Sequence, residues 1–145
     1  MKAITYTINK DIKALTEIID LVLKDIMLVH FICDDILFEL KVVLNELITN
    51  ALCHGNKCEL EKVIYVTFKL VRYNYLYISV RDEGFGFQLK VNSKVIDDYL
   101  EEVNRTLCEH GRGLVIVYNL CDKVKFNKCG NKVSILKNLE PVSFN

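Results

Sequence analysis

The chain has 145 residues, of which 51% are apolar and 26% charged, as expected for one soluble globular domain with its own core. Its formal net charge is zero, which argues against bulk binding to nucleic acid or an anionic membrane but leaves room for a local basic patch. It shows no signal peptide and no apolar run long enough to span a bilayer. We therefore expect a cytoplasmic protein with one domain over residues 1–145 and no direct contact with nucleic acid or membrane.

The first half of the chain predicts one strand and two helices. Residues 3–8 alternate apolar and polar, as in a strand. A helical period follows from Ile12, with Asn9 or Asp11 as its cap. A second helix is expected from Asp34 to about Cys53, before Gly55. Its buried stripe is predicted to contain Ile36, Leu40, Val43, Leu44, Leu47 and Ala51, and a second, polar stripe to contain Glu39, Glu46, Asn50 and Cys53.

The second half predicts two hairpins around one helix. Alternation over 62–71 and 75–82 indicates the first hairpin, and over 122–128 and 132–137 the second. The long polar connection 88–110 is typical of a functional lid, with a short helix at about 95–103. A helix then begins at Gly111-Arg112-Gly113. This order predicts a two-layer α/β (α+β) sandwich, in which helices cover one face of a mixed, mainly antiparallel sheet.

Three stretches are candidates for chemistry. Glu46 and Asn50 are one helical turn apart within an apolar segment, where unpaired polar groups are costly. Asp82 ends a strand and precedes Gly84 and Gly86, and glycine permits φ > 0 and a close approach to a ligand. Gly111-Arg112-Gly113 begins a helix, whose N-terminus favours an anion. Taken alone, the Asp82 loop is better explained as a hairpin turn and the Gly111 stretch as a loop-to-helix junction, whereas the Glu46–Asn50 pair favours a function over a half-exposed helix face.

Taken together, the three stretches suggest one ligand, a phosphate ester with a metal ion. Asp82 would bind its organic head group and the glycine-led helix its phosphates. Asn50 would bind Mg²⁺, which prefers oxygen ligands. The six cysteines form no CxxC pair, and the spacing of Cys53, His54 and Cys58 matches no common zinc pattern.

The same residues resemble motifs of the GHKL (Bergerat-fold) ATPases. Glu46-Leu47-Ile48-Thr49-Asn50-Ala51 is similar to their N box. Asp82-Glu83-Gly84-Phe85-Gly86-Phe87 is similar to their adenine loop, and Gly111-Arg112-Gly113-Leu114 to their second glycine box. The length and the continuation to His54-Gly55 most resemble the small stand-alone anti-sigma-factor serine/threonine kinases of bacteria.

The resemblance implies a Bergerat ATP-binding fold and a role for each motif residue. Glu46 would be the general base, and Asn50 would coordinate Mg²⁺. Asp82 would accept a hydrogen bond from the adenine amine. The remaining ATP-binding residues would be Gly84, Gly86, Phe87, Gly111, Arg112, Gly113 and Leu114.

The implied activity is phosphorylation of an anti-sigma-factor antagonist in a partner-switching pathway, with a sigma factor as a further partner. The alternatives are a non-catalytic module in which ATP or ADP gates a protein partner, and a structural domain that binds no nucleotide. An exposed edge strand at 3–8 would be compatible with a homodimer. The last hairpin departs from the family pattern, since Lys132 stands at the expected place of a threonine that supports the adenine site, with Ser134 two residues on.

Overall fold

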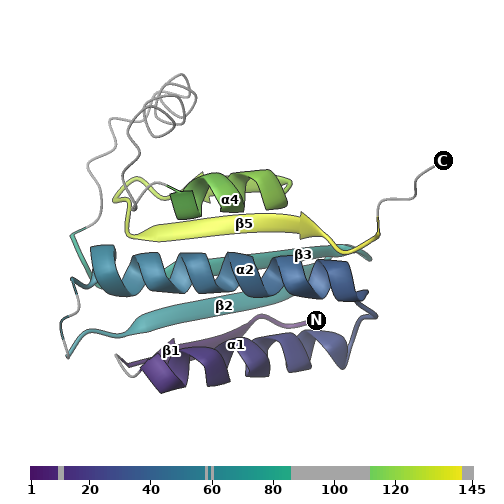
Figure 1. Ribbon diagram of the computed structural model, residues 1–145, viewed down its shortest axis with the longest axis horizontal. Coiled ribbons are helices and arrows are strands. Elements are labelled where there is room, and N and C mark those ends of the chain that lie inside the picture. The colour runs from purple at the N-terminus through teal and green to yellow at the C-terminus, as the bar shows by residue number, and fades with distance from the viewer. Residues whose placement is uncertain (10–11, 58, 60, 86–111, 142–145) are drawn as a thin grey trace.

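The computed structural model describes residues 1–9, 12–57, 59, 61–85 and 112–141 (Figure 1). In that part of the chain, helices and strands follow in the order β1 (Ile4–Ile8), α1 (Ile12–Met27), α2 (Asp34–Asn50), the π-helical turn η1 (Ala51–Gly55), β2 (Ile64–Val71), β3 (Tyr75–Arg81), α4 (Arg112–Leu120), β4 (Lys123–Phe126) and β5 (Lys132–Asn138).

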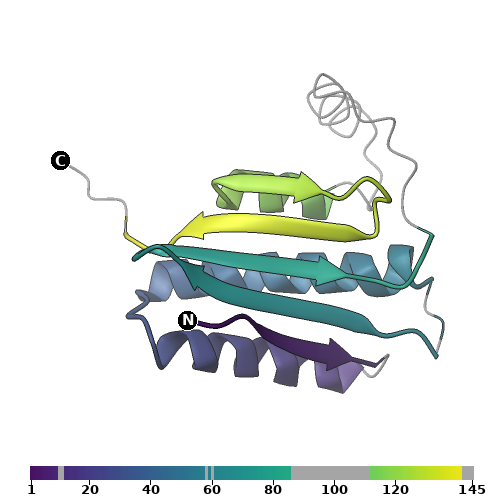
Figure 2. The same cartoon turned by 180° about the vertical axis from the view of Figure 1, so that it is seen from behind.

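The strands form one sheet in the order β1-β2-β3-β5-β4, and every neighbouring pair is antiparallel. The helices lie on one face of this sheet (Figure 1), and the view from behind shows the strands in front of them (Figure 2). The predicted two-layer sandwich is confirmed, and the sheet is antiparallel throughout its described strands. β1 lies at an edge, as its sequence position suggested.

The core lies between α2 and the middle of the sheet. All six apolar residues predicted for the buried stripe of α2 are buried, and Leu40, Val43 and Leu44 are fully so. They meet alternate residues of β2 and β3, whose period of two sends every second side chain toward the helices. α2 therefore serves as the central support, against which α1 packs on one side and α4 on the other.

One ion pair joins the layers through a buried lysine and a carboxylate that is one-third exposed. Lys137 of β5 is only 5% exposed, and its Nζ lies 2.5 Å from Glu39 Oε2 on α2 and 2.6 Å from the carbonyl oxygen of Leu120 at the end of α4. Glu39, which the sequence placed on the polar stripe of α2, is therefore a structural residue that ties α2, α4 and the sheet together.

Most predicted elements are found within a few residues of their expected ends. The second helix runs to Asn50 as an α-helix and continues as the π-helical turn through Gly55. The expected lid at 88–110, including its short helix at 95–103, lies outside the described residues. Among the residues described, no helix is both long and apolar enough to cross a bilayer.

Candidate active site

Glu46 lies against the first turn of α4. A Cβ atom added to Gly113 would be only 2.1 Å from Glu46 Oε2, so the carboxylate touches the glycine itself. The N-terminus of a helix presents unpaired N–H groups and the positive end of the helix dipole. The structure therefore brings together two sequence candidates that are 67 residues apart in the chain, a carboxylate and a helix N-terminus suited to an anion.

Asn50 stands one turn beyond Glu46, at the last residue of α2, and both side chains are half-buried. Immediately after it the helix widens into η1, where the Asn56 N–H donates to the Ala51 carbonyl, five residues back, at 2.8 Å. Such π-helical turns are rare and are frequently found at functional sites. Here the wider turn ends at Gly55, directly beneath the loop that carries Asp82.

Asp82 and Gly84 pack onto the main chain of Gly55. A Cβ on Gly55 would be 2.1 Å from Asp82 Oδ2, and a Cβ on Gly84 would be 2.0 Å from the carbonyl oxygen of Gly55. Gly84 does not adopt positive φ, so that part of the sequence prediction is wrong. Its requirement is steric: a side chain cannot fit between the two main-chain segments.

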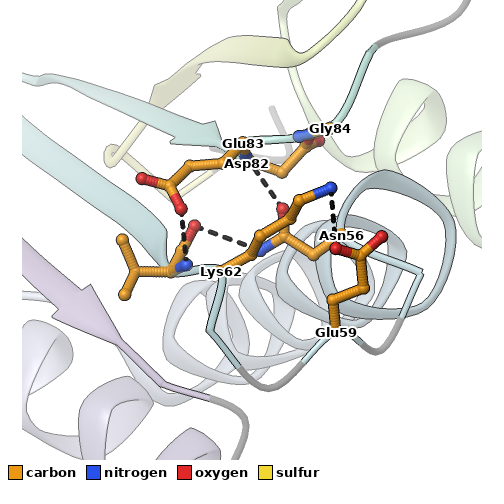
Figure 3. Close-up of polar contacts among 7 residues, drawn as sticks. Asn56, Glu59, Lys62, Asp82, Glu83 and Gly84 are labelled. Atoms are coloured by element: carbon orange, nitrogen blue, oxygen red, sulfur yellow. Dashed lines mark hydrogen bonds and ion pairs between the residues drawn. The ribbon is translucent and has the colours of Figure 1, made fainter.

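Asn56 holds the Asp82 loop in place (Figure 3). Its side chain is 1% exposed; Oδ1 accepts a hydrogen bond from the Glu83 N–H at 2.8 Å, and Nδ2 donates to the Val63 carbonyl at 3.1 Å. The Glu83 carboxylate in turn accepts from the Val63 N–H and the Tyr65 hydroxyl. Asn56 was not among the candidates chosen from the sequence. The only signal was an asparagine directly after the glycine that ends the N-box segment.

The carboxyl group of Asp82 is 8% exposed, and burial raises its pKa above 3.8. The Gly84 N–H, which donates to Oδ1 at 2.8 Å, and the positive charge of Lys62 oppose that rise. A carboxylate oxygen has further lone pairs, so Asp82 can still accept from a ligand amine. Burial of this carboxylate disfavours its ionised form, which is the cause of the raised pKa.

Several predicted residues are only partly described. Gly86, Phe87 and Gly111 lie outside the described residues, and Arg112 is described only as the first residue of α4. Leu114 follows Gly113 in the first turn of α4 and is half-buried. Their roles as ATP-binding residues stay predictions.

Lys132 does not occupy the position that the sequence analysis gave it. The alternation of β5 buries Val133 and Ile135 against the helices, so Lys132 and Ser134 lie on the opposite face of the sheet. Ser134 Oγ lies 3.0 Å from the Tyr77 hydroxyl on that face. Asp82 follows Arg81, the cross-strand partner of Lys132, so it lies opposite Asn131, whose carbonyl oxygen accepts from the Asp82 N–H at 2.9 Å. Asp82 is buried on the helix side of the sheet, and Lys132 and Ser134 face away from it.

The arrangement fits a nucleotide with its base and phosphates at separate places. At one, a buried carboxylate and close-packed glycines form a rigid acceptor loop at the end of β3. At the other, the Glu46 carboxylate lies against the N-terminus of α4, and Asn50 follows one helical turn further along α2. These groups suit ATP with a bound cation. The Asp82 carboxylate can accept from an amine, the N–H groups of α4 can donate to phosphates, and side-chain oxygens can bind the metal.

Comparison with known families agrees with this geometry. The model of the histidine kinase-like ATPase domain matches residues 9–137. The chain belongs to this family. Membership covers every described element from α1 to β5, and it implies that the domain binds ATP through a Bergerat fold.

Among curated proteins, this ATPase domain is similar to anti-sigma F factors. It is 30% identical over 91 residues to the one from Priestia megaterium, covering 63% of the chain and 60% of the relative. It is 29% identical over 109 residues to those from Bacillus subtilis and Anoxybacillus flavithermus, covering 72% of the chain and 71% of each relative. The chain thus spans less than two thirds of the Priestia relative.

Proposed function

We propose that this ATPase domain is a serine/threonine protein kinase that uses Mg²⁺-ATP. The contact between the Glu46 carboxylate and Gly113 is the observation that supports the proposal, because a carboxylate beside the N-terminus of α4 would act as a base next to the N–H groups proposed to bind phosphate. A domain that only bound nucleotide would need the donors but no carboxylate beside them. Phosphoryl transfer depends mostly on positioning and electrostatics, which such a compact site can supply.

Each residue has a defined task in this proposal. Glu46 takes the proton from the attacking serine or threonine hydroxyl, for which its position matters first and its pKa second. Asn50 holds Mg²⁺ through its amide oxygen, and the ion neutralises charge on the phosphates. Asp82 accepts from the adenine amine. Gly113, with Gly111, Arg112 and Leu114, lines the phosphates, while Gly84, Gly86 and Phe87 pass beside the base.

The relatives suggest the class of protein substrate. They are named anti-sigma F factors, so we propose that the phosphoryl acceptor is an anti-sigma-factor antagonist and that a sigma factor is a second partner. The domain would act in the cytoplasm, with residues 88–110 as its lid and residues 1–145 as one unit. A homodimer through the β1 edge is compatible with this role.

The first experiment separates binding from chemistry. Glu46→Gln should retain ATP affinity, measured by calorimetry with Mg²⁺, and should lower transfer of the γ-phosphate to a candidate antagonist by about 10²- to 10⁴-fold. Glu17→Gln, which neutralises an exposed carboxylate on α1, is the matched control and should leave both quantities unchanged. Wild-type protein that fails to bind Mg²⁺-ATP would refute the proposal.

A second variant tests the metal. Asn50→Ala should weaken ATP binding in Mg²⁺ much more than in EDTA, because only the first condition uses the amide oxygen. Equal losses in both conditions would remove Asn50 as the ligand. Tight ATP binding by the wild type without transfer to any antagonist would favour the nucleotide-gated module instead.

A further inference from the structure

The face of the sheet opposite the helices is the one toward the viewer in Figure 2, and the register of its strands places a set of cations there. The antiparallel register groups its side chains into rows across the strands. One row runs from Tyr65 through Arg81 to Lys132, the next from Thr67 through Ser79 and Ser134 to Lys125, and a third from Lys69 through Tyr77 and Leu136 to Lys123. Each row holds at least one positive charge. We call this the cationic face.

Its charge is one-sided. Among the outward-facing residues of the described strands, five are cations, namely Lys69, Arg81, Lys123, Lys125 and Lys132, and none is an acid. The nearest acids lie beyond the strand ends and are engaged there: Glu83 accepts from Val63 and Tyr65, and Asp122 from the Asn138 N–H. Because the whole chain is neutral, this is a real separation of charge between its two faces.

The arrangement is unfavourable for the isolated domain. Arg81 and Lys132 are direct cross-strand partners, a position in which like charges destabilise a sheet. The local potential also affects Tyr77, whose pKa is raised by burial but lowered overall by hydrogen bonds from Ser134 and Ser79 and by the charge of Lys132. A bound anion would relieve this repulsion.

We propose that the cationic face docks an acidic protein surface. The two tyrosine rings within the three rows both lie beneath cations, which favours charge over base stacking as the available chemistry. Arg81 lies over the Tyr65 ring, 4.4 Å from its centroid, and Lys69 lies 5.5 Å from the centroid of Tyr77. Binding of single-stranded nucleic acid usually needs free aromatic faces as stacking platforms, so carboxylates are the better partner.

The size of the face sets the strength of binding. Five strands about 4.8 Å apart and on average about six residues long give a surface of roughly 19 Å by 21 Å. This is about half of the area that one partner contributes to a standard interface, so the contact is expected to be transient and sensitive to salt. At one border lies a hollow of 340 Å³, whose lining includes the cations Arg72 and Lys123 and the carboxylate of Asp122. A second copy of the domain would place cations against cations.

The test uses the full chain and poly-L-glutamate as an acidic polypeptide probe. Wild type should bind it with an affinity that falls as NaCl rises from 50 to 500 mM. The triple variant Lys69→Gln, Lys123→Gln, Lys125→Gln should lose about tenfold in affinity. The control Lys2→Gln, Lys24→Gln, Lys41→Gln changes net charge equally at exposed positions on other surfaces, and it should bind as wild type does.

Several outcomes would overturn the proposal. Equal weakening in both triple variants would show a non-specific charge effect. Tighter binding of the wild type to oligo-dT or to phosphatidylserine vesicles than to poly-L-glutamate would assign the face to another class of ligand. A dimer lost only in the Lys69, Lys123 and Lys125 variant would make it a self-association surface. ATP affinity, which should be unchanged in both variants, verifies folding and separates this result from that of the kinase assay.

Discussion

Gly113→Ala tests the central contact of the proposed kinase site. The new Cβ would lie 2.1 Å from Glu46 Oε2, and ordinary contact begins at 3.4 Å, so the carboxylate must move by about 1.3 Å. The obstructing atom is the end of a flexible side chain, so the fold can accommodate the change. Replacing glycine by alanine within a helix also gains about 0.5–1 kcal/mol, and we expect stability to be equal or slightly higher.

The expected loss is in catalysis. A displacement of about 1 Å from a productive geometry can cost about a hundredfold in rate, so kcat for γ-phosphate transfer should fall by about that factor. The Gly113 N–H remains, and the ATP dissociation constant should change by less than about threefold. Asn119→Ala, an exposed substitution on the same helix, is the control for altered helix propensity and should transfer phosphate normally.

A double-mutant cycle makes the test decisive. If Gly113→Ala acts by displacing Glu46, it should have no further effect in the Glu46→Gln background. The reasoning would be refuted if Gly113→Ala transferred phosphate at the wild-type rate, or if the rate losses of the two single variants multiplied in the double variant. Gly84→Ala offers a contrast: its Cβ would meet the Gly55 carbonyl oxygen, which belongs to the backbone and cannot swing aside. That variant should lose about 1–3 kcal/mol of stability, measured by urea unfolding.

Three further predictions concern the surrounding framework. Glu39→Gln should cost about 3 kcal/mol in urea unfolding, because it leaves the Lys137 ammonium buried without its carboxylate, while Glu39→Leu with Lys137→Met should recover most of that loss. Asn56→Ala should lower the free energy of unfolding by about 2 kcal/mol, because it leaves the Glu83 N–H and the Val63 carbonyl without their side-chain partner, and it should weaken ATP binding. Asp82→Asn should weaken ATP binding at least about tenfold. The folded state raises the pKa of Asp82, so its stabilising contribution is present below pH 3.8 and is lost as pH rises through the folded pKa. Urea midpoints should therefore shift in favour of the asparagine variant as pH increases toward 7, and a constant difference would contradict this assignment.

The sequence predicted the layers because each depends on a local period. Alternation located the four strands of the hairpins, and a stripe from Ile36 to Ala51 located the face of α2 that is buried. The motif residues were also found locally, as polar groups or glycines out of keeping with their neighbours. Glu46, Asp82 and Gly113 needed no tertiary information to be chosen as candidates.

What the sequence could not supply were relations between distant residues. Asn56 looked like any loop asparagine until its partners Val63 and Glu83 were in place. Gly84 was chosen because glycine permits positive φ and a close approach to a ligand, whereas the structure shows no positive φ there and a close approach to a carbonyl oxygen 29 residues earlier in the chain. Lys132 was assigned by its distance from Gly130, but the face that a strand residue occupies depends on register and not on counting alone.

Two contacts between α2 and α4 together set the position of one helix along the other. At one end Glu46 touches Gly113, and at the other Glu39 and the Leu120 carbonyl share the Lys137 ammonium. Each pair of positions is seven residues apart on its own helix, about 10.5 Å at 1.5 Å per residue, so the antiparallel helices are held in matching register. The ion pair between Lys137 and Glu39 therefore limits how far α4 can slide along α2. It thereby sets the position of the N-terminus of α4, the proposed phosphate end of the site, relative to the Glu46 carboxylate. Glu39→Gln should then lower kcat for phosphate transfer in protein that is still fully folded. The double variant Glu39→Leu, Lys137→Met restores packing but not the hydrogen bond to the Leu120 carbonyl. It should therefore recover the free energy of unfolding more completely than it recovers kcat.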